Sequence, residues 1–327
     1  MKDWNAAPIL SARNLTRRYG EHIGCRGVSF DLWPGEVLGI VGESGSGKST
    51  LLNMLSGRIE PTSGTIAYRD AAGRERNIHA LPEGEKRRLL RSELGFVHQR
   101  PSDGLRMQVS AGANIGERLM AEGARHYGTL RGRALQWLER VEIDAGRIDD
   151  KPALYSGGMQ QRLQIARNLV TSPRLVFMDE PTTSLTDPEI ERVFDMMRML
   201  QKQNVAIVFI SHTLKEVMEV CNRYTVLRDG NMVAAGPVAE VTTADLARFM
   251  VGHDVRTENL HQDKELGGEI LRGEGLGDGA HFRDISFTVH AGEVLGVTGL
   301  LGDGRSELFQ AVFGDLPYTG QLFMEGQ

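Results

Sequence analysis

The residues best suited to chemistry lie in one glycine-rich segment. Residues 42–49 read Gly-Glu-Ser-Gly-Ser-Gly-Lys-Ser, which matches the phosphate-binding pattern G-x-x-x-x-G-K-[ST]. Glycines let backbone N–H groups crowd around a polyphosphate, because no Cβ atom stands in the way. Lys48 would reach the β- and γ-phosphates, and the Ser49 hydroxyl would bind Mg²⁺. The segment predicts a nucleotide site formed by Gly42, Glu43, Ser44, Gly45, Ser46, Gly47, Lys48, Ser49 and Thr50.

An apolar strand must lead into this loop, and a helix must follow it. Residues 37–41 predict the strand, and residues 50–55 predict a helix whose N-terminus adds partial positive charge beside the phosphates. Two further apolar runs, 175–178 and 205–210, flank a predicted helix with Pro188 near its start. Strands that alternate with helices predict an α/β fold with a parallel sheet covered on both faces.

The segments between these runs are less regular. Residues 84–170 predict a mostly helical region, and within it residues 131–141 place apolar side chains at helical spacing. The glycine-containing segments 20–27 and 69–76 predict turns.

Polar side chains follow the other predicted strands. Asp179 and Glu180 end an apolar strand, where Asp179 would hold Mg²⁺ and Glu180 would act as general base on the attacking water. His212 also follows a predicted strand, and this position predicts that it senses the γ-phosphate. Gln99, at the end of another strand, could bind Mg²⁺ and orient water. Tyr19 could stack on an adenine ring, which the sequence alone leaves open.

Composition excludes several classes of protein. A chain of 327 residues has room for two domains, and 40% hydrophobic with 25% charged residues is typical of a soluble globular protein. The sequence contains no run of 18 apolar residues, so no membrane span is predicted. The N-terminus has no apolar stretch long enough for a signal peptide. Cys25 and Cys221 have no metal-binding spacing and predict reduced thiols in a cytosolic protein. A net charge of −5 gives no general attraction to nucleic acid, so no nucleic-acid partner is expected.

The phosphate-loop region occurs twice in the chain. Residues 28–57 and 285–314 align without gaps. The second copy has Arg305 where the first has Lys48, so a planar guanidinium group replaces a compact ammonium group.

This repeat determines the expected domains. Residues 256–269 are polar and unpatterned, and from residue 271 about 57 residues follow, fewer than the ~100–200 of an ordinary domain. We therefore expect a first domain at 1–254, a linker at 255–270 and the N-terminal part of an incomplete second domain at 271–327.

One more motif completes a set. Residues 155–162 read Tyr-Ser-Gly-Gly-Met-Gln-Gln-Arg directly before a predicted helix, which makes a second anion-binding helix terminus from Ser156, Gly157, Gly158 and Gln160. With the phosphate loop and the Asp-Glu strand, in this order, residues 8 to about 253 resemble the ATP-binding-cassette (ABC) ATPase family. The resemblance implies a P-loop NTPase fold of the ABC type, with a parallel-sheet core and antiparallel β and helical subdomains.

The family resemblance also implies cofactors, a partner and residue roles. ATP and Mg²⁺ are the implied cofactors, with Ser49, Gln99 and Asp179 on the metal. The implied partner is a second copy, in a head-to-tail dimer where each Ser-Gly-Gly signature clamps the γ-phosphate on the other chain's phosphate loop. Lys48, Gln99, Glu180 and His212 are the implied catalytic residues, with Glu180 as base and His212 as switch, and Tyr19 would lie on the adenine.

Two groups within the family are similar to different parts of the chain. Up to residue 180 the sequence resembles the ATPase subunits of phosphonate C–P lyase systems, on stretches that include 28–48, 98–101, 103–106, 108–112, 114–120, 123–128, 148–150 and 156–170. From residue 183 it resembles ribose/xylose-type sugar importer ATPases, which carry two cassettes and the same arginine-containing second loop, on 183–186, 209–212, 226–230, 249–252 and 299–308. Thr186, in place of the aspartate of most cassettes, fits the sugar group. The change predicts that two segments are joined near residues 179–182.

Three functions fit these patterns. The first, which we predict, is an Mg-dependent ATPase subunit bound to the core subunits of a phosphonate C–P lyase system. The second is the ATP-binding subunit of a sugar importer, docked on a membrane permease near residues 99–120. The third is an inactive nucleotide-binding fusion product. A cytoplasmic location is implied, peripheral at the inner face of the cell membrane if the partner is a permease.

Overall fold

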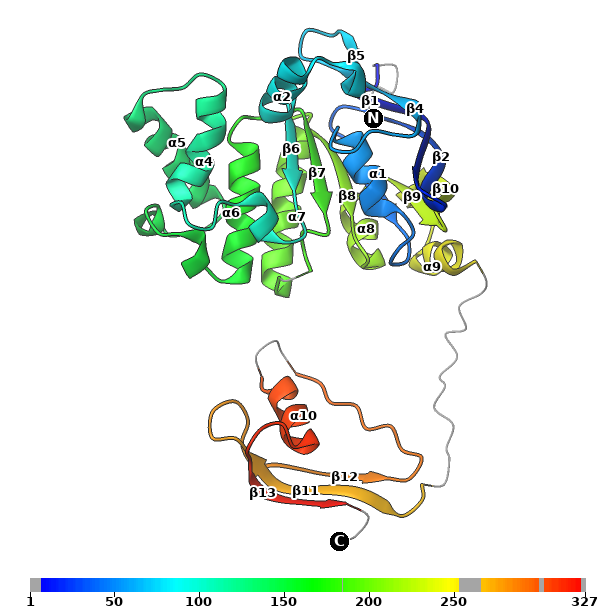
Figure 1. Cartoon of the computed structure of the whole chain (residues 1–327), viewed down its shortest axis with the longest axis vertical. Coiled ribbons are helices and arrows are strands. Elements are labelled where there is room, and N and C mark those ends of the chain that lie inside the picture. Colours follow the sequence, from blue (N-terminus) through cyan, green and yellow to red (C-terminus); the bar gives the residue numbers. More distant parts are fainter. Residues whose placement is uncertain (1–6, 184, 253–265, 300–302, 325–327) are drawn as a thin grey trace. The chain divides into compact units, whose positions relative to one another are not determined.

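The computed structural model describes residues 7–183, 185–252, 266–299 and 303–324. The chain divides into two compact units, Met1–Val255 and Arg256–Gln327, which are described separately (Figure 1). Of the predicted linker, residues 255–265 lie outside the described residues, as does Ser184 in the stretch 183–186.

A ten-stranded sheet forms the centre of the first unit. Its strand order is β5-β4-β1-β2-β10-β9-β3-β8-β7-β6. Strands β9, β3, β8, β7 and β6 are parallel, whereas β10 and the group β5, β4, β1 and β2 pair mostly antiparallel. The bounds are β1 Leu10–Tyr19, β2 His22–Leu32, β3 Val37–Val41, β4 Ser63–Arg69, β5 Glu75–Asn77, β6 Leu94–Val97, β7 Leu175–Asp179, β8 Ala206–Ile210, β9 Arg223–Arg228 and β10 Asn231–Pro237.

Helices cover both faces of the parallel part. Helix α1 packs Leu51 and Leu52 against Leu38 and Ile40 of β3 on one face, together with β1 and β2. Helices α4 to α8 pack on the opposite face, and α4 and α5 extend beyond the β6 edge (Figure 1). The bounds are α1 Lys48–Leu55, α2 Glu83–Ser92, α3 Pro101–Gly104, α4 Ala111–Ala121, α5 Tyr127–Arg140, α6 Gly157–Leu169, α7 Asp187–Lys202, α8 Leu214–Val220 and α9 Thr243–Val251, with 3₁₀ turns at Ile78–Ala80, Ala145–Arg147, Pro152–Leu154 and Val238–Glu240.

This arrangement confirms the predicted α/β fold. The apolar strands β3, β7 and β8 are buried almost throughout, as a sheet covered on both faces requires. Their carboxyl ends meet at one edge, since parallel strands run in the same direction. The phosphate loop leaves β3 at this edge, and Glu180 and His212 follow β7 and β8 there.

One local prediction was wrong. Residues 20–27 were predicted as a turn, but β2 begins at His22 and continues through Gly24 and Gly27. Its backbone pairs with β1, with Arg18 opposite Ile23 and Arg17 opposite Cys25. Backbone pairing on a neighbouring strand outweighs the low strand propensity of glycine, which is a weak and context-dependent preference.

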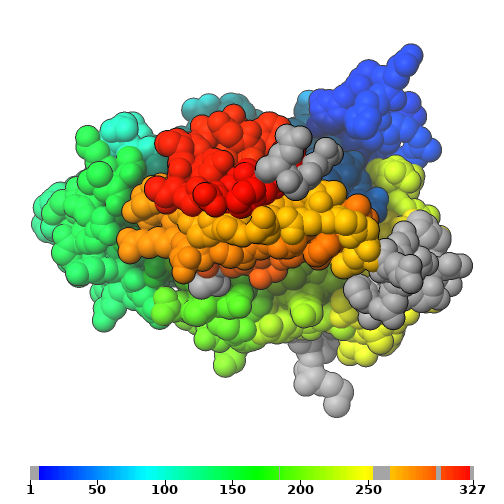
Figure 2. Space-filling model, turned by 90° about the horizontal axis from the view of Figure 1, so that it is seen from below, coloured from blue at the N-terminus to red at the C-terminus, as the bar shows by residue number. Residues whose placement is uncertain are grey.

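The second unit has its own small sheet and helix. Strands β11 (Glu269–Gly277), β12 (Ile285–His290) and β13 (Thr319–Met324) pair antiparallel in the order β12-β11-β13, and Figure 2 shows them side by side in amber, orange and red. Helix α10 (Arg305–Phe313) packs Leu308 and Ala311 on this sheet, against Leu276 and Phe282.

The order of these elements parallels the start of the first unit. There, β1 lies between β2 and β4, and α1 begins after Gly47 in a left-handed conformation, as α10 does after Gly304. Residues 294–298, which the repeat aligns with β3, form no strand and are exposed, with Val294 95% exposed. In the first unit β3 pairs with β8 and β9, and the described part of the second unit contains no counterparts of these strands. No helix within the described ranges is long and apolar enough to cross a membrane.

Candidate nucleotide-binding site

The backbone of the phosphate loop requires glycine at two positions. Gly42 and Gly47 have φ angles of 155° and 99°. A Cβ atom at Gly47 would lie 2.0 Å from the carbonyl oxygen of Gly24, and one at Gly42 would lie 2.2 Å from the carbonyl oxygen of Leu227. The loop is therefore pressed against the backbones of β2 and β9, and its shape depends on these two residues.

Lys48 crosses the loop from the first turn of α1. Its Nζ donates hydrogen bonds to the carbonyl oxygens of Gly42 and Glu43, both at 2.8 Å. Burial lowers the pKa of Lys48, whereas the nearby carboxylates of Glu180 and Asp179 raise it. An ammonium held in this position, with two carboxylates close by, is placed to neutralise an anionic ligand.

The loop fits a polyphosphate in two further respects. Gly45, at φ 81°, has open space where a side chain would stand. A cleft of about 580 Å³ opens over the loop, which is within the usual size of small-molecule sites. Ser46, in contrast, does not line the cleft: its buried Oγ has no hydrogen-bond partner among the described residues and would lie 2.4 Å from a Cβ atom at Gly42.

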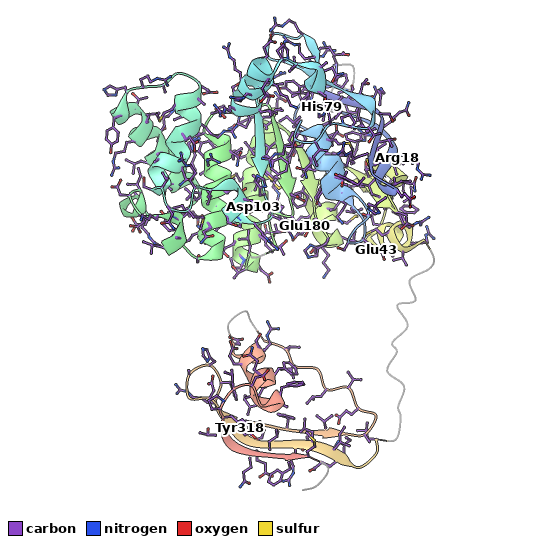
Figure 3. All side chains as sticks on the ribbon, in the orientation of Figure 1. Arg18, Glu43, His79, Asp103, Glu180 and Tyr318 are labelled. Carbon is purple, nitrogen blue, oxygen red and sulfur yellow. The ribbon has the colours of Figure 1, made fainter. Side chains whose placement is uncertain are left out.

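The cleft brings most of the predicted residues together. Glu43 and Glu180 lie at the same edge of the sheet (Figure 3). Three lining residues, His22, Gly24 and Met250, were not predicted, because nothing in their local sequence sets them apart. The predicted residues in the lining are Gly42, Glu43, Ser44, Gly45, Gly47, Lys48, Ser49, Thr50, Gln99, Glu180 and His212.

Glu180 lies at the centre of a three-residue contact. Gln99 Nε2 donates to its Oε2 at 3.2 Å, and His212 Nδ1 lies 3.1 Å from the same oxygen. The three residues come from the ends of β6, β7 and β8. Glu180 also has φ 44°, which is uncommon for a side chain with a Cβ atom, and its N–H donates to the carbonyl oxygen of Ile210 at 3.1 Å. The neighbouring strand thus holds the backbone of Glu180 in this conformation.

Asp179 and Ser49, two of the three residues predicted to bind Mg²⁺ (Gln99 is the third), contact each other. Ser49 Oγ donates to Asp179 Oδ1 at 3.3 Å. Burial raises the pKa of Asp179, and Ser49, Lys48 and Arg58 oppose that shift. The described residues contain no group of three or more His, Cys, Asp or Glu side chains placed to hold a metal. Two oxygen ligands fit Mg²⁺ nonetheless, because Mg²⁺ commonly takes one or two protein oxygens and completes its shell with water and substrate phosphates.

The Ser-Gly-Gly segment lies elsewhere. Ser156 caps α6, and its Oγ accepts from Met159 N–H at 3.3 Å. Gln160 Nε2 donates to the Tyr155 carbonyl at 3.1 Å. None of Ser156, Gly157, Gly158 and Gln160 lines the cleft of its own chain, and Ser156 and Gly157 are exposed.

Tyr19 also lies outside the cleft lining, but next to it. A Cβ atom at Gly24, which does line the cleft, would lie 2.9 Å from Tyr19 Cε2 and 2.9 Å from Thr50 Cγ2. The ring is 43% exposed, and the guanidinium of Arg17 lies 4.8 Å from its centroid.

A buried carboxylate behind the site was missed at the sequence level. Glu216 Oε2 accepts from Thr182 Oγ1 at 2.9 Å and from Ser211 Oγ at 2.6 Å. Thr182 follows Glu180 by two residues, and Ser211 directly precedes His212. Glu216 thus joins the two segments that carry the contact at Glu180. Glu219, one turn further along the same helix, is exposed, and no sequence pattern separates the two.

Comparisons with known proteins decide the family. The ABC transporter family model matches residues 25–183. The "Putative phosphonates utilization ATP-binding protein PhnK" of Escherichia coli (strain K12) is 56% identical over 230 residues, which cover 70% of this chain and 89% of that protein. The chain belongs to the ABC transporter family of ATP-binding proteins. Binding and hydrolysis of ATP is the general activity of ABC ATPase domains.

Other ABC proteins are similar to more of the chain or to its fold. The ribose import ATP-binding protein RbsA of Geobacillus kaustophilus is 34% identical over 328 residues, which cover 98% of this chain. The chain spans 63% of the length of that relative. The dimeric post-hydrolysis structure of the cassette MJ0796, bound to ADP and Pi, has a TM-score of 0.64 and 28% identity, and covers 70% of this chain and 98% of its own.

These matches confirm the resemblance to both groups and the ABC-type fold. The sequence was expected to resemble the phosphonate group only up to residue 180. The match to PhnK covers 230 residues, so it continues beyond that point into the later part of the cassette. A junction near residues 179–182 stays a prediction. ABC cassettes form dimers, as the MJ0796 structure does.

Proposed function

We propose that this chain is the Mg²⁺-dependent ATPase subunit of a phosphonate C–P lyase system. The observation that carries hydrolysis is the Glu180 carboxylate, held by Gln99 and His212 beside Lys48. The observation that favours the phosphonate system is the 56% identity to PhnK of E. coli, a protein named for phosphonate utilisation. The location proposed is cytoplasmic, with the lyase core subunits as partners.

The protein's own residues account for binding and for the chemical step. Lys48 and the N–H groups at the start of α1 bind the β- and γ-phosphates. Ser49, Asp179 and Gln99 would hold Mg²⁺, which neutralises charge on the phosphate oxygens when bound. Glu180 accepts a proton from the attacking water, and His212 holds the carboxylate in place and responds to the γ-phosphate.

The second half of the proposal is a head-to-tail dimer of two chains. The Ser156-Gly157-Gly158 turn is exposed and lies outside its own cleft, so it is free to contact another chain's nucleotide. The N-terminus of α6 carries partial positive charge, which suits a γ-phosphate. Gly158 leaves room for Glu189, because a Cβ atom there would lie 2.2 Å from Glu189 Oε1. Closure over two ATP molecules and reopening after hydrolysis would drive the attached complex.

A second candidate is the ATP-binding subunit of a sugar importer. The observation that favours it is the match to RbsA over 98% of the chain, which includes the second unit. In this case the second unit is the N-terminal part of a second cassette, and a permease would dock near residues 99–120. The third candidate, an inactive fusion product, draws support from the exposed Val294, Leu295 and Phe309.

ATP turnover by purified variants tests the catalytic assignment. Glu180→Gln should retain ATP binding and lose about 10²–10⁴-fold in turnover, the usual contribution of a positioned general base. Lys48→Ala should lose both binding and turnover. Glu219→Gln is the matched control, since Glu219 is exposed and pairs with Arg198 away from the cleft. Turnover in Glu180→Gln equal to that of the control would exclude Glu180 as the base.

Affinity purification from the native host tests the system. Recovery of lyase core subunits, identified by mass spectrometry, would support the phosphonate assignment. Recovery of a sugar permease would replace it by the second candidate. Intact chain recovered alone, without ATP turnover, would favour the fusion product.

A further inference from the structure

The outer edge of β6 is paired by side chains of a helix. Strand β6 ends the sheet order, so one of its edges has no neighbouring strand among the residues that the structure describes. Such an edge presents N–H and C=O groups that need partners when buried. Asn168 of α6 provides one partner there: its Oδ1 accepts from the Phe96 N–H at 3.0 Å.

Gln164 pairs with the next available backbone position. Its Oε1 accepts from the His98 N–H at 2.5 Å, and its Nε2 donates to the His98 carbonyl at 3.1 Å. Gln161 Nε2 lies 3.3 Å from the same carbonyl as a second donor. One side-chain amide thus makes both hydrogen bonds that a neighbouring strand would make to a residue. We call Gln161, Gln164 and Asn168 the amide ladder.

The amide ladder is buried and internally satisfied. Gln161, Gln164 and Asn168 are 3%, 0% and 3% exposed. Gln164 Nε2 also lies 3.2 Å from Gln161 Oε1, and Asn168 Nδ2 donates to the Gln164 carbonyl at 2.9 Å. Buried amides with all partners in place hold one geometry, because any other leaves a polar group unpaired.

The ladder connects two parts of the proposed catalytic site. His98 directly precedes Gln99, whose Nε2 donates to Glu180. Helix α6 starts at the Ser156-Gly157-Gly158 turn and carries the ladder on its following turns. A shift of this rigid helix therefore moves the His98 backbone, and Gln99 with it.

We propose that Gln164 is a positioning residue, which holds Gln99 against α6 so that the Ser156 turn and Glu180 respond together. The inference rests on the proposed function, because it assigns Gln164 an action only through Gln99. It adds a residue to the site that makes no contact with nucleotide.

A double-mutant cycle in the full-length protein tests this action. Gln164→Met keeps the length of the side chain but cannot pair with His98. It should lower kcat about 10- to 100-fold, the usual cost of removing a group that orients a ligand residue. ATP affinity, measured separately, should stay within about twofold, since Lys48 and the phosphate loop are untouched. In a Gln99→Ala background the same substitution should cause no further loss, because the residue through which it acts is gone.

A matched control separates positioning from general damage to the core. Asn114 is a fully buried amide on α4 that bonds to the backbones of Arg106 and Val109, away from Glu180. The fold-losses in kcat from Asn114→Leu and from Gln99→Ala should multiply in the double variant, as expected for independent sites.

A second perturbation leaves Gln164 itself in place. A Cβ atom at Gly104 would lie 2.4 Å from Gln164 Oε1, so Gly104→Ala should displace the amide and reproduce the non-additive loss with Gln99→Ala. If the wild type is active but Gln164→Met or Gly104→Ala lowers kcat by the same factor with and without Gln99→Ala, this inference alone is overturned. Absence of ATP turnover in the wild type would instead overturn the proposed function, and this inference with it.

Discussion

Removal of the Glu216 carboxylate should destabilise the first unit strongly. Glu216, Thr182 and Ser211 are 7%, 5% and 1% exposed, and one carboxylate oxygen accepts from both hydroxyls. Glu216→Ala leaves the buried Thr182 hydroxyl without an acceptor, whereas the Ser211 hydroxyl keeps only the Thr213 carbonyl at 3.4 Å. An unpaired buried hydroxyl costs about 1–3 kcal/mol and the weakened Ser211 bond adds less, so the free energy of unfolding should fall by about 2–3 kcal/mol. That is a large part of the ~5–15 kcal/mol available to a typical domain.

The same helix provides the control. Glu219 is exposed and pairs with Arg198 at 2.5 Å on the surface, so Glu219→Ala should cost about 0–1 kcal/mol. Both substitutions make the same change in helix propensity on α8. Glu216→Gln keeps an oxygen that can accept from both hydroxyls, and its loss should be less than half that of Glu216→Ala.

Urea unfolding followed by tryptophan fluorescence measures these differences. All three tryptophans lie within residues 1–255, so the signal reports the first unit. With a denaturant slope of about 3 kcal/mol/M, Glu216→Ala should lower the midpoint by roughly 1 M. Equal midpoints for Glu216→Ala and Glu219→Ala would refute the hydrogen-bond argument. ATP turnover should fall in parallel, because Thr182 and Ser211 hold the segments that carry Glu180 and His212, the proposed catalytic residues.

Three further outcomes follow from the structure. Tyr19→Ala should weaken ATP binding by about 1–3 kcal/mol, whereas Tyr19→Phe should not, if the ring stacks on the base; nucleotide titration by fluorescence decides this. Burial lowers the pKa of His79 below its ordinary 6.5, so its contribution to stability is complete above pH 6.5 and is lost as pH falls through the folded-state value. The stability difference between wild type and His79→Gln should therefore shrink from pH 7 to pH 5. Hydrogen exchange should be fast at residues 294–298 and slow at residues 37–41 in the same molecule, and equal protection would contradict the description of the second unit.

The residues at strand ends were predictable because chemistry restricts their types. A polyphosphate site needs glycine, lysine and a hydroxyl at set spacing, and the structure places Gly42, Lys48 and Ser49 around one cleft. Glu180 and His212 could be found in the same way, since parallel strands deliver their carboxyl ends to one edge.

Residues that act through tertiary contacts could not be found in this way. Glu216 and Glu219 lie on the same short helix with similar neighbours, and only the packed structure shows that one is buried. Gln161 and Gln164 are ordinary helix formers in the sequence. Their role depends on the backbone of His98, which directly follows β6 and lies more than 60 residues away in the sequence.

The internal repeat separates local preference from tertiary support. Residues 37–41 and 294–298 have nearly the same pattern, Val-Leu-Gly-Ile-Val and Val-Leu-Gly-Val-Thr, yet one is a central strand and the other is not a strand. The helix that follows this sequence forms in both units, because its hydrogen bonds are local and a glycine in the left-handed conformation precedes it. The strand needs partners on both sides, which β8 and β9 provide in the first unit and which are absent from the described part of the second. A β-strand is thus a property of its neighbours as much as of its residues, and the described residues before Arg305 include no buried strand like the one that precedes Lys48.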